Sequence, residues 1–444
     1  MRRPITDQLP RLKALQPPTP FARSGRDVAP AHRPAPGQAY GSLSSLDPGS
    51  AKLAQILGAS VKQNSHGEHL SLHGWHGRYA PCSPTPAALQ LLAPEGPEEI
   101  ADPQQWLFLD TETTGIMGGT GTYPFLVGVA WWEGGGLEIE QLFMREYSEE
   151  RSLLAALAER LAERPVLVTF NGKSFDWPLL ETRYRMTRAI PPPTPRAHLD
   201  FLHPARNLWR LRLGSVRLSQ LERHVLGWDR GQDIASEQIP SIYRDFVRYG
   251  RAEPLVAVFE HNQMDLLGLA GLSGRVLSLL GEEAASDDGL ELYGVSRLCE
   301  RRGQTKRARR FYERSITSML PSETDRAART ALARLAKRDG DFACARELWE
   351  SARGNSRAGY EAYEQLAIYL EHEAREPRQA LETARLALAE LRHAHQCGTI
   401  AAVAFRKAKA RFEHRAIRLE RKSERSLLDA CDGDQEQIRG TSAG

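Results

Sequence analysis

The sequence lacks the features of a membrane protein, a disulfide-rich fold or a cysteine-ligated zinc module. No apolar run approaches the roughly 20 residues that a membrane helix needs, and the basic N-terminus shows no apolar signal segment. The five cysteines lie far apart without a CxxC pair, which favours a reducing, cytoplasmic location. Bulk charge is also absent, because 59 Lys and Arg nearly balance 56 Asp and Glu. A nucleic-acid-binding surface must therefore be local.

The two terminal regions of the sequence are polar, and the first is rich in turn-forming residues. Residues 1–100 are dominated by Pro, Gly, Ser and Ala, and we expect most of this region to be disordered. One exception is residues 45–61, SLDPGSAKLAQILGASV, where a short helix with Ser or Asp at its cap is predicted. Residues 426–444 are predicted to form a polar tail. The 444 residues leave room for two or three domains between these ends.

The pattern from residue 101 to 282 predicts an α/β domain. WLFLDTE, FLVGVAWWE and GLEIEQLFMRE read as three strands with short links, which is typical of an antiparallel meander. EERSLLAALAERLAER follows with leucines at helical spacing, and VLVTF then reads as a buried strand. The chain from about residue 175 reads as mainly helical. Strands interrupted by a helix predict a mixed sheet with flanking helices.

Residues 290–425 have a different composition, rich in Ala, Arg, Glu and Leu, and they repeat. Gly303 and Gly340 are 37 residues apart, as are Ala308 and Ala345, and Ala380 follows 35 residues later. Helix–turn–helix units with a period in the mid-thirties resemble tetratricopeptide repeats. The alternative is an ordinary antiparallel helical bundle. Repeats of this type would offer a surface to a protein partner.

Four acids and one histidine are the candidate chemical groups. Asp110 and Glu112 are two apart on a predicted strand, so both carboxylates share one face and could hold a divalent cation. Asp176 follows the turn Asn171-Gly172, where its alternative role is a helix cap. His261 and Asp265 are four apart in a predicted helix and hence lie on one face.

Together these three segments resemble the DEDD superfamily of ribonuclease-H-like 3′–5′ exonucleases. DxE, then N-x-x-x-F-D, then a His before the last Asp occur in the family order over about residues 105–280. DTETTG followed by GGTGTY-F-LVG, and DFLHPARNLWR from Asp200, is similar to the bacterial YprB-type branch, which often carries helical repeats. The resemblance implies a ribonuclease-H-like fold and two Mg²⁺ or Mn²⁺ ions. Their ligands would be Asp110, Glu112, Asp176 and Asp265.

The histidine departs from the family pattern. Subfamilies carry a Tyr four residues before the last Asp or a His five before it, whereas here His261 stands at the Tyr spacing. An imidazole could deprotonate the attacking water or only hold geometry. His261 is therefore a catalytic candidate whose role as general base stays open.

Candidate substrate contacts lie around these segments. The glycine-rich GGTGTY segment is either a tight hairpin turn or a loop that a nucleotide can approach. Nine arginines between residues 183 and 223 suit phosphate binding, with a solvated helix face as the alternative. A second basic run, RKAKARFEHRAIRLERKSER, reads as a charged helix that caps a bundle. The residues predicted to bind substrate are Thr113, Thr114, Tyr123, Asn171, Arg206 and Arg210.

The predicted function is hydrolysis of phosphodiester bonds at single-stranded ends of DNA or RNA, with two cations clamping the scissile phosphate. An alternative is a nuclease-like fold that binds nucleic acid without cleaving it. A further alternative is a scaffold whose repeats recruit a protein. Internal cleavage by the same fold also stays open, and no membrane partner is expected.

Overall fold

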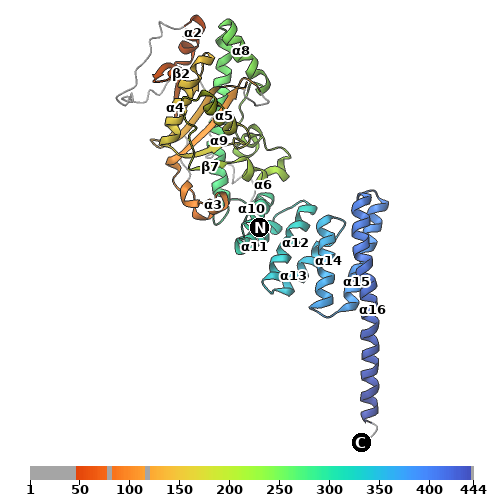
Figure 1. Ribbon diagram of the computed structural model, residues 1–444. Coiled ribbons are helices and arrows are strands. Elements are labelled where there is room, and N and C mark those ends of the chain that lie inside the picture. The colour runs from red at the N-terminus through yellow and green to blue at the C-terminus, as the bar shows by residue number, and fades with distance from the viewer. Residues whose placement is uncertain (1–46, 78–82, 116–120, 442–444) are drawn as a thin grey trace, which may run out of the picture. The chain divides into compact units, whose positions relative to one another are not determined.

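The computed structural model describes residues 47–77, 83–115 and 121–441, with side chains up to residue 424. Contacts divide the chain into two units, one ending at Ala285 and the other beginning at Ser286. Each unit is described by itself (Figure 1). In the part of the chain that is described, no helix is both long enough and apolar enough to cross a membrane.

A seven-stranded mixed sheet organises the first unit. The spatial order is β1-β2-β5-β4-β3-β6-β7. The predicted meander of β3, β4 and β5 is confirmed as antiparallel, while β6 and β7 run parallel to β3. The strands are β1 (Ser60–Asn64), β2 (Gly67–His76), β3 (Trp106–Thr113), β4 (Pro124–Glu133), β5 (Gly136–Phe143), β6 (Val166–Thr169) and β7 (Ala197–Asp200).

Helices surround this sheet, as the mixed α/β prediction requires. The sequence pattern placed α4 and the mainly helical stretch after β6, but it missed β7, whose four residues are too few to show an alternation. The helices are α2 (Pro48–Leu57), α3 (Pro86–Leu92), α4 (Glu150–Glu163), α5 (Asp176–Thr187), α6 (Leu202–Leu213), α7 (Leu218–Leu221), α8 (Ile239–Tyr249) and α9 (Glu253–Leu280).

The region before residue 100 differs from its prediction. Residues 1–46 and 78–82 lie outside the described residues, but residues 47–77 are ordered and extend the sheet. The predicted short helix is confirmed as α2, with the Asp47 side chain accepting hydrogen bonds from the backbone N–H groups of Gly49 and Ser50. β1 and β2 add an antiparallel hairpin to β5. This hairpin was not predicted from the sequence, because its half-exposed strands are rich in polar residues.

The two faces of the sheet are covered by different helices. Arg160 of α4 and Arg164, which directly follows this helix, lie over the Trp131 ring on β4, whereas Asn262 of α9 reaches Gly128 on the same strand. Residues 128 and 131 are separated by an odd number, so they face opposite sides. β4 is buried along almost its whole length for this reason. The position of α9 matters for function, because it crosses the carboxylates of β3.

The pairing of β2 with β5 includes a histidine that is held between two acids. His73 Nε2 lies 3.1 Å from Glu140 and Nδ1 lies 3.4 Å from Glu138. Burial alone would lower the pKa of His73, but these two hydrogen bonds and charges raise it to about 9. The raised pKa means that the folded state holds this proton more tightly than the unfolded state.

We expect His73→Gln to lower the free energy of unfolding by about 1 kcal/mol at pH 6, since a partly exposed pair is screened by solvent. The difference from wild type should shrink as the pH rises from 6.5 through 9, where the folded state loses the proton. Urea unfolding at pH 6, 8 and 10 measures it. His66→Gln, in the β1–β2 turn, is the control; a pH-independent difference for His73→Gln would contradict the expectation.

The second unit is helical throughout its described residues. Consecutive helices pack as hairpins, and Gly303 and Gly340 take positive φ at two of the turns. Arg375 takes positive φ at the third turn, 35 residues after Gly340. Ala308, Ala345 and Ala380 follow these turns, and all three are fully buried. The helices are α10 (Gly289–Arg301), α11 (Thr305–Thr317), α12 (Ser322–Arg338), α13 (Phe342–Ala352), α14 (Arg357–His372), α15 (Pro377–Gln396) and α16 (Ala402–Thr441).

Candidate active site

The site begins at the carboxyl end of β3. Asp110 and Glu112 project to the α9 side of the sheet, and Thr111 between them projects to the other side. Asp110 is paired in register with Gly128 on β4. A Cβ at Gly128 would lie only 2.2 Å from Oδ1 of Asn262, so the glycine makes room for α9 to dock against the strand.

An amide chain fixes α9 over this pair of strands. Asn262 Nδ2 donates to Asp110 Oδ2 at 2.8 Å, and Gln141 Nε2 on β5 donates to Asn262 Oδ1 at 2.9 Å. Gln141 also donates to the carbonyl of Phe259 at 2.8 Å. Gln141 and Asn262 are buried, so these bonds satisfy groups that water does not reach. The orientation of α9 on the sheet is set by this chain of hydrogen bonds.

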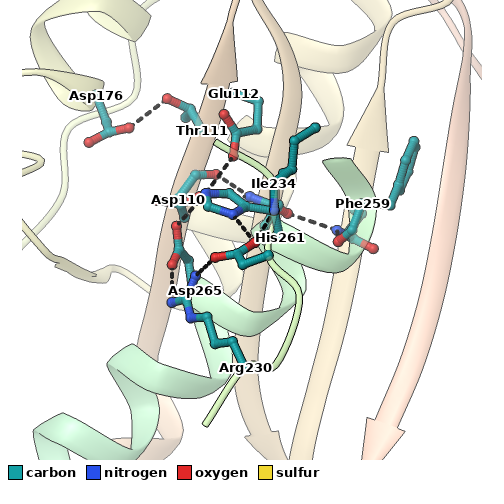
Figure 2. Close-up of polar contacts among 12 residues, drawn as sticks. Asp110, Thr111, Glu112, Asp176, Arg230, Ile234, Phe259, His261 and Asp265 are labelled. Atoms are coloured by element: carbon teal, nitrogen blue, oxygen red, sulfur yellow. Dashed lines mark hydrogen bonds and ion pairs between the residues drawn. The ribbon is translucent and has the colours of Figure 1, made fainter. Parts of the chain in front are cut away.

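α9 brings the predicted histidine and last acid together with β3. His261 Nε2 lies 3.8 Å from Glu112 Oε1 and 3.5 Å from Asp265 Oδ2 (Figure 2). The donor atoms of these three residues all lie within 4.8 Å of one another. Their side chains are 10–18% exposed, so the group is largely shielded from solvent.

A loop after the π-helical turn Glu222–Leu226 completes the surroundings. Asp233 Oδ1 lies 2.7 Å from His261 Nδ1. Arg230 contacts Asp233 at 3.0 Å and pairs with Asp265 and Glu222. A proton on Nδ1 directed at Asp233 leaves the lone pair of Nε2 directed toward Glu112 and Asp265.

The electrostatics of this site favour a cation. Burial raises the pKa of Asp110, and the nearby charges of Asp265 and Asp176 raise it further. The pKa of Glu112 is raised by the same burial and by the charge of Asp110. Both shifts have the sign expected when carboxylates repel one another in a poorly solvated place. Carboxylate oxygens and an imidazole nitrogen are ligands that Mn²⁺ and Mg²⁺ accept, so the residues fit the cation that the sequence predicted.

Asp176 lies beside the cluster, not among its three donors. It is the first residue of α5, and its Oδ1 accepts a hydrogen bond of 2.5 Å from Thr111 Oγ1 (Figure 2). Burial raises the pKa of Asp176 to about 6, against the effect of that hydrogen bond. The hydrogen bond from Thr111 ties Asp176 to β3, and the charge of Asp176 is near enough to contribute to the raised pKa of both Asp110 and Glu112.

The turn before Asp176 is held by an acid on β7. Asp200 accepts hydrogen bonds from the backbone N–H groups of Asn171, Lys173 and Leu202 at 2.8–3.1 Å. Asn171 takes a positive φ of 71°, which Asn tolerates better than most residues. Asn171 is thus part of the turn that precedes Asp176, and the residue is half-buried.

The predicted contacts of the glycine-rich segment serve the hairpin in this structure. Thr113 Oγ1 donates to the Gly115 carbonyl at 2.8 Å, and Thr114 Oγ1 accepts from the Tyr123 N–H at 3.0 Å. The Tyr123 ring lies 3.7 Å from the Arg183 guanidinium. Residues 116–120, the middle of the segment, lie outside the described residues. The hydrogen bonds of these hydroxyls favour the interpretation of the GGTGTY segment as a tight hairpin turn.

The arginine-rich segment divides into paired and exposed members. Arg183 is buried and pairs with Glu150, and Arg196 bonds Gln105, so these two support the fold. Arg206 and Arg210 are exposed on α6, one helical turn apart. α6 follows directly from the end of β7, at the edge where β3 also ends. The structure does not bring Arg206 or Arg210 into the acidic cluster.

Several residues of the site were not predicted. Asn262, Asp233 and Arg230 each touch a predicted group, yet only Asn262 has a local signal, since it is next to His261. Arg230 and Asp233 lie in an irregular loop whose place against α9 depends on tertiary packing. No spacing rule connects such a loop to a strand 120 residues earlier.

Comparison with known proteins agrees with this architecture. The family model of the RNase H superfamily matches residues 107–276. The chain is 32% identical over 287 residues to YprB of Bacillus subtilis (strain 168), described as uncharacterized, covering 64% of this chain and 69% of YprB. A family B DNA polymerase from the archaeon Pyrobaculum calidifontis aligns at 17% identity and a TM-score of 0.31, over 45% of this chain but only 29% of that chain; this likeness is too slight to carry an argument. The chain belongs to the YprB family and carries an RNase H superfamily domain.

Proposed function

We propose that this chain is a divalent-cation-dependent nuclease that hydrolyses phosphodiester bonds, acting 3′–5′ on single-stranded ends of DNA or RNA. The observation that carries the proposal is the group of donors from Glu112, His261 and Asp265 on an RNase H superfamily domain. The direction of digestion comes from the sequence resemblance alone. Of the four acids that the resemblance implies (Asp110, Glu112, Asp176 and Asp265), we propose that Glu112 and Asp265 contact a cation together with His261, and that Asp110 and Asp176 add negative charge beside it.

The chain's own residues have distinct roles in this proposal. A bound divalent cation would supply Lewis-acid activation of water and charge neutralisation at the phosphate. Asp110 is held toward the site by Asn262, and His261 is oriented by Asp233. The lone pair of His261 Nε2 is available to a cation or to a water proton. The resemblance implies two cations, and the three donors account for one of them.

Features around the acids fit a single-stranded substrate. Phe175, just before Asp176, is 61% exposed, and an exposed ring can stack on a base. We propose that Arg206 and Arg210 contact backbone phosphates, since exposed arginines on one helix face suit that role. Thr113, Thr114, Tyr123 and Asn171 would shape the approach to the acids through the turns that they support.

The test is a cleavage assay on DNA and RNA oligonucleotides labelled at the 5′ end. We expect stepwise shortening from the 3′ end with Mn²⁺ or Mg²⁺ and none with EDTA. Mn²⁺ should be effective at lower concentration, because an imidazole ligand suits it better than Mg²⁺. A circular single strand should resist, and cutting of that circle would reassign the chain as an endonuclease.

The assay also separates cleavage from simple binding. If the folded chain retains the oligonucleotide on a gel with either cation but never shortens it, the chain is a nucleic-acid-binding module. The matched control is Asp245→Asn, which removes an exposed acid that pairs with Arg251 on the surface. This variant should cleave like wild type.

We further propose that the second unit is a tetratricopeptide-like scaffold for a protein partner. Three successive hairpins share a positive-φ residue at the turn and a buried alanine after it. α16 carries the second basic run and buries Phe412, Ala416 and Leu419 along one face, as expected of a helix that caps a stack. The domain boundaries proposed are 101–282 for the nuclease and 290–425 for the repeats.

A further inference from the structure

The loop between the π-helical turn Glu222–Leu226 and α8 places a positive charge inside the acidic site. The Arg230 guanidinium pairs with Asp265 through Nη2 (Figure 2). It also pairs with Asp233 through Nη1 and with Glu222 through Nε and Nη2. Its side chain is only 10% exposed. Arg230 is thus a buried member of the site, and neither the sequence motifs nor the family resemblance includes it.

Arg230 is held in place by features built for it. Its main partner, Glu222, is 2% exposed and accepts two of its N–H groups. Glu222 fits against α9 because position 268 is glycine, where a Cβ would lie 1.8 Å from Glu222 Oε1. Moving the guanidinium away would leave the Glu222 carboxylate buried without it, which costs several kcal/mol. Arg230 therefore belongs to the rigid framework.

A second glycine of α9 supports the same loop. A Cβ at Gly271 would lie 2.5 Å from the Trp228 ring, so the loop packs closely against α9 at Trp228 as well as at Glu222. Gly268 and Gly271 are two of the three glycines in this 28-residue helix, and each lowers its intrinsic stability by about 1 kcal/mol relative to alanine. Their presence here is explained by the close approach of the loop that carries Arg230.

The two carboxylate oxygens of Asp265 have different partners, because Arg230 contacts only one of them. Oδ1 accepts from Arg230, and Oδ2 faces His261 Nε2 at 3.5 Å. A cation beside Glu112 and His261 would therefore meet Asp265 through Oδ2. The other oxygen already has a positive partner, which cannot lose its charge at any working pH.

We propose that Arg230 is a resident counter-cation of this site, so that the chain binds one divalent cation, through Glu112, His261 and Oδ2 of Asp265, while the guanidinium supplies the second positive charge. This inference rests on the proposed function for its chemistry. It changes the expectation of two metal ions that the family resemblance carries. Arg230 is a positioning and charge-compensating residue here, since it touches Asp265 and not the substrate.

The test counts Mn²⁺ ions bound to the full chain, by electron paramagnetic resonance of free Mn²⁺ after removal of metals with EDTA. Wild type is expected to bind one Mn²⁺. The double variant Glu222→Gln/Arg230→Gln removes one charge of each sign, so the net charge is unchanged, and its two amides can still bond each other. With Oδ1 of Asp265 free, this variant should bind two Mn²⁺ ions.

Three results would overturn the inference: two ions on wild type, one ion on the double variant, or none on either. Arg223→Gln, on the exposed side of the same π-helical turn, is the matched control and should bind one ion. Circular dichroism verifies folding. If the double variant does not fold, Arg230→Lys replaces it, because a single ammonium beside Glu222 cannot also hold Asp265. That variant should take up a second ion at higher Mn²⁺ concentration, and a count of one would equally refute the proposal.

The count is independent of catalysis. If wild type binds one Mn²⁺ but cleaves no oligonucleotide, the proposed nuclease activity fails and the role of Arg230 stands. If oligonucleotides are cleaved and wild type binds two ions, the reverse holds.

Discussion

Asp110→Asn is expected to lower the rate of oligonucleotide cleavage at least about 10³-fold, the size of effect seen when one preorganised electrostatic group is removed from an active site. The asparagine side chain has nearly the same shape, and its oxygen can still accept the hydrogen bond from Asn262. What is lost is the negative charge that a cation needs beside Glu112. The measurement is the initial rate with Mn²⁺ under single-turnover conditions.

The same variant should be at least as stable as wild type when divalent cations are absent. Burial and the neighbouring acids raise the pKa of Asp110, which means that its charged form is unfavourable in the fold. A neutral side chain removes that repulsion, so the midpoint of thermal unfolding in EDTA should be equal or higher. A variant that keeps more than a tenth of the activity would refute the assigned role, and a lower midpoint would refute the electrostatic argument.

Gly128→Ala is expected both to destabilise the fold and to lower the activity of the site. The new Cβ would meet Asn262 Oδ1 at 2.2 Å, so α9 must move away from β4. Overpacking of this kind costs about 1–3 kcal/mol, and a shift of about 1 Å in the site can lower activity about 10²-fold. Urea unfolding and the cleavage assay measure the two effects.

Two further variants test whether the clash with Asn262 causes the effects of Gly128→Ala. Gly121→Ala adds the same methyl group where no atom of the described residues lies within 4 Å, and it should change stability little. Adding Asn262→Ala to Gly128→Ala removes the clash, so part of the stability should return while activity stays low, because Asp110 then lacks its donor. Full recovery of activity in the double variant would show that the Asn262 bond is not needed.

The sequence predicted the central strands well because they are buried and strongly patterned. β3, β4 and β5 read as apolar runs separated by short links, and His261 and Asp265 share a helix face by simple spacing. The alternation of a strand also placed Asp110 and Glu112 on the same side. In each case the signal is local, within about five residues.

The features that the sequence did not predict depend on contacts between segments that are distant in the chain. The β1–β2 hairpin is polar and half-exposed, so its composition resembles a loop until β5 pairs with it. Arg230 and Asp233 reach the site only because Gly268 and Gly271 let their loop lie against α9. The hydrogen bond from Thr111 to Asp176 likewise joins segments 65 residues apart, and no local spacing indicates it.

The site is assembled from β3 and from α9, whose contributing residues lie about 150 positions later in the chain. During synthesis the first acids emerge from the ribosome well before Glu253, where α9 begins. A nascent or truncated chain would then carry Asp110 and Glu112 without the helix that completes the cluster. The proposed nuclease activity would thus be absent until the domain has closed.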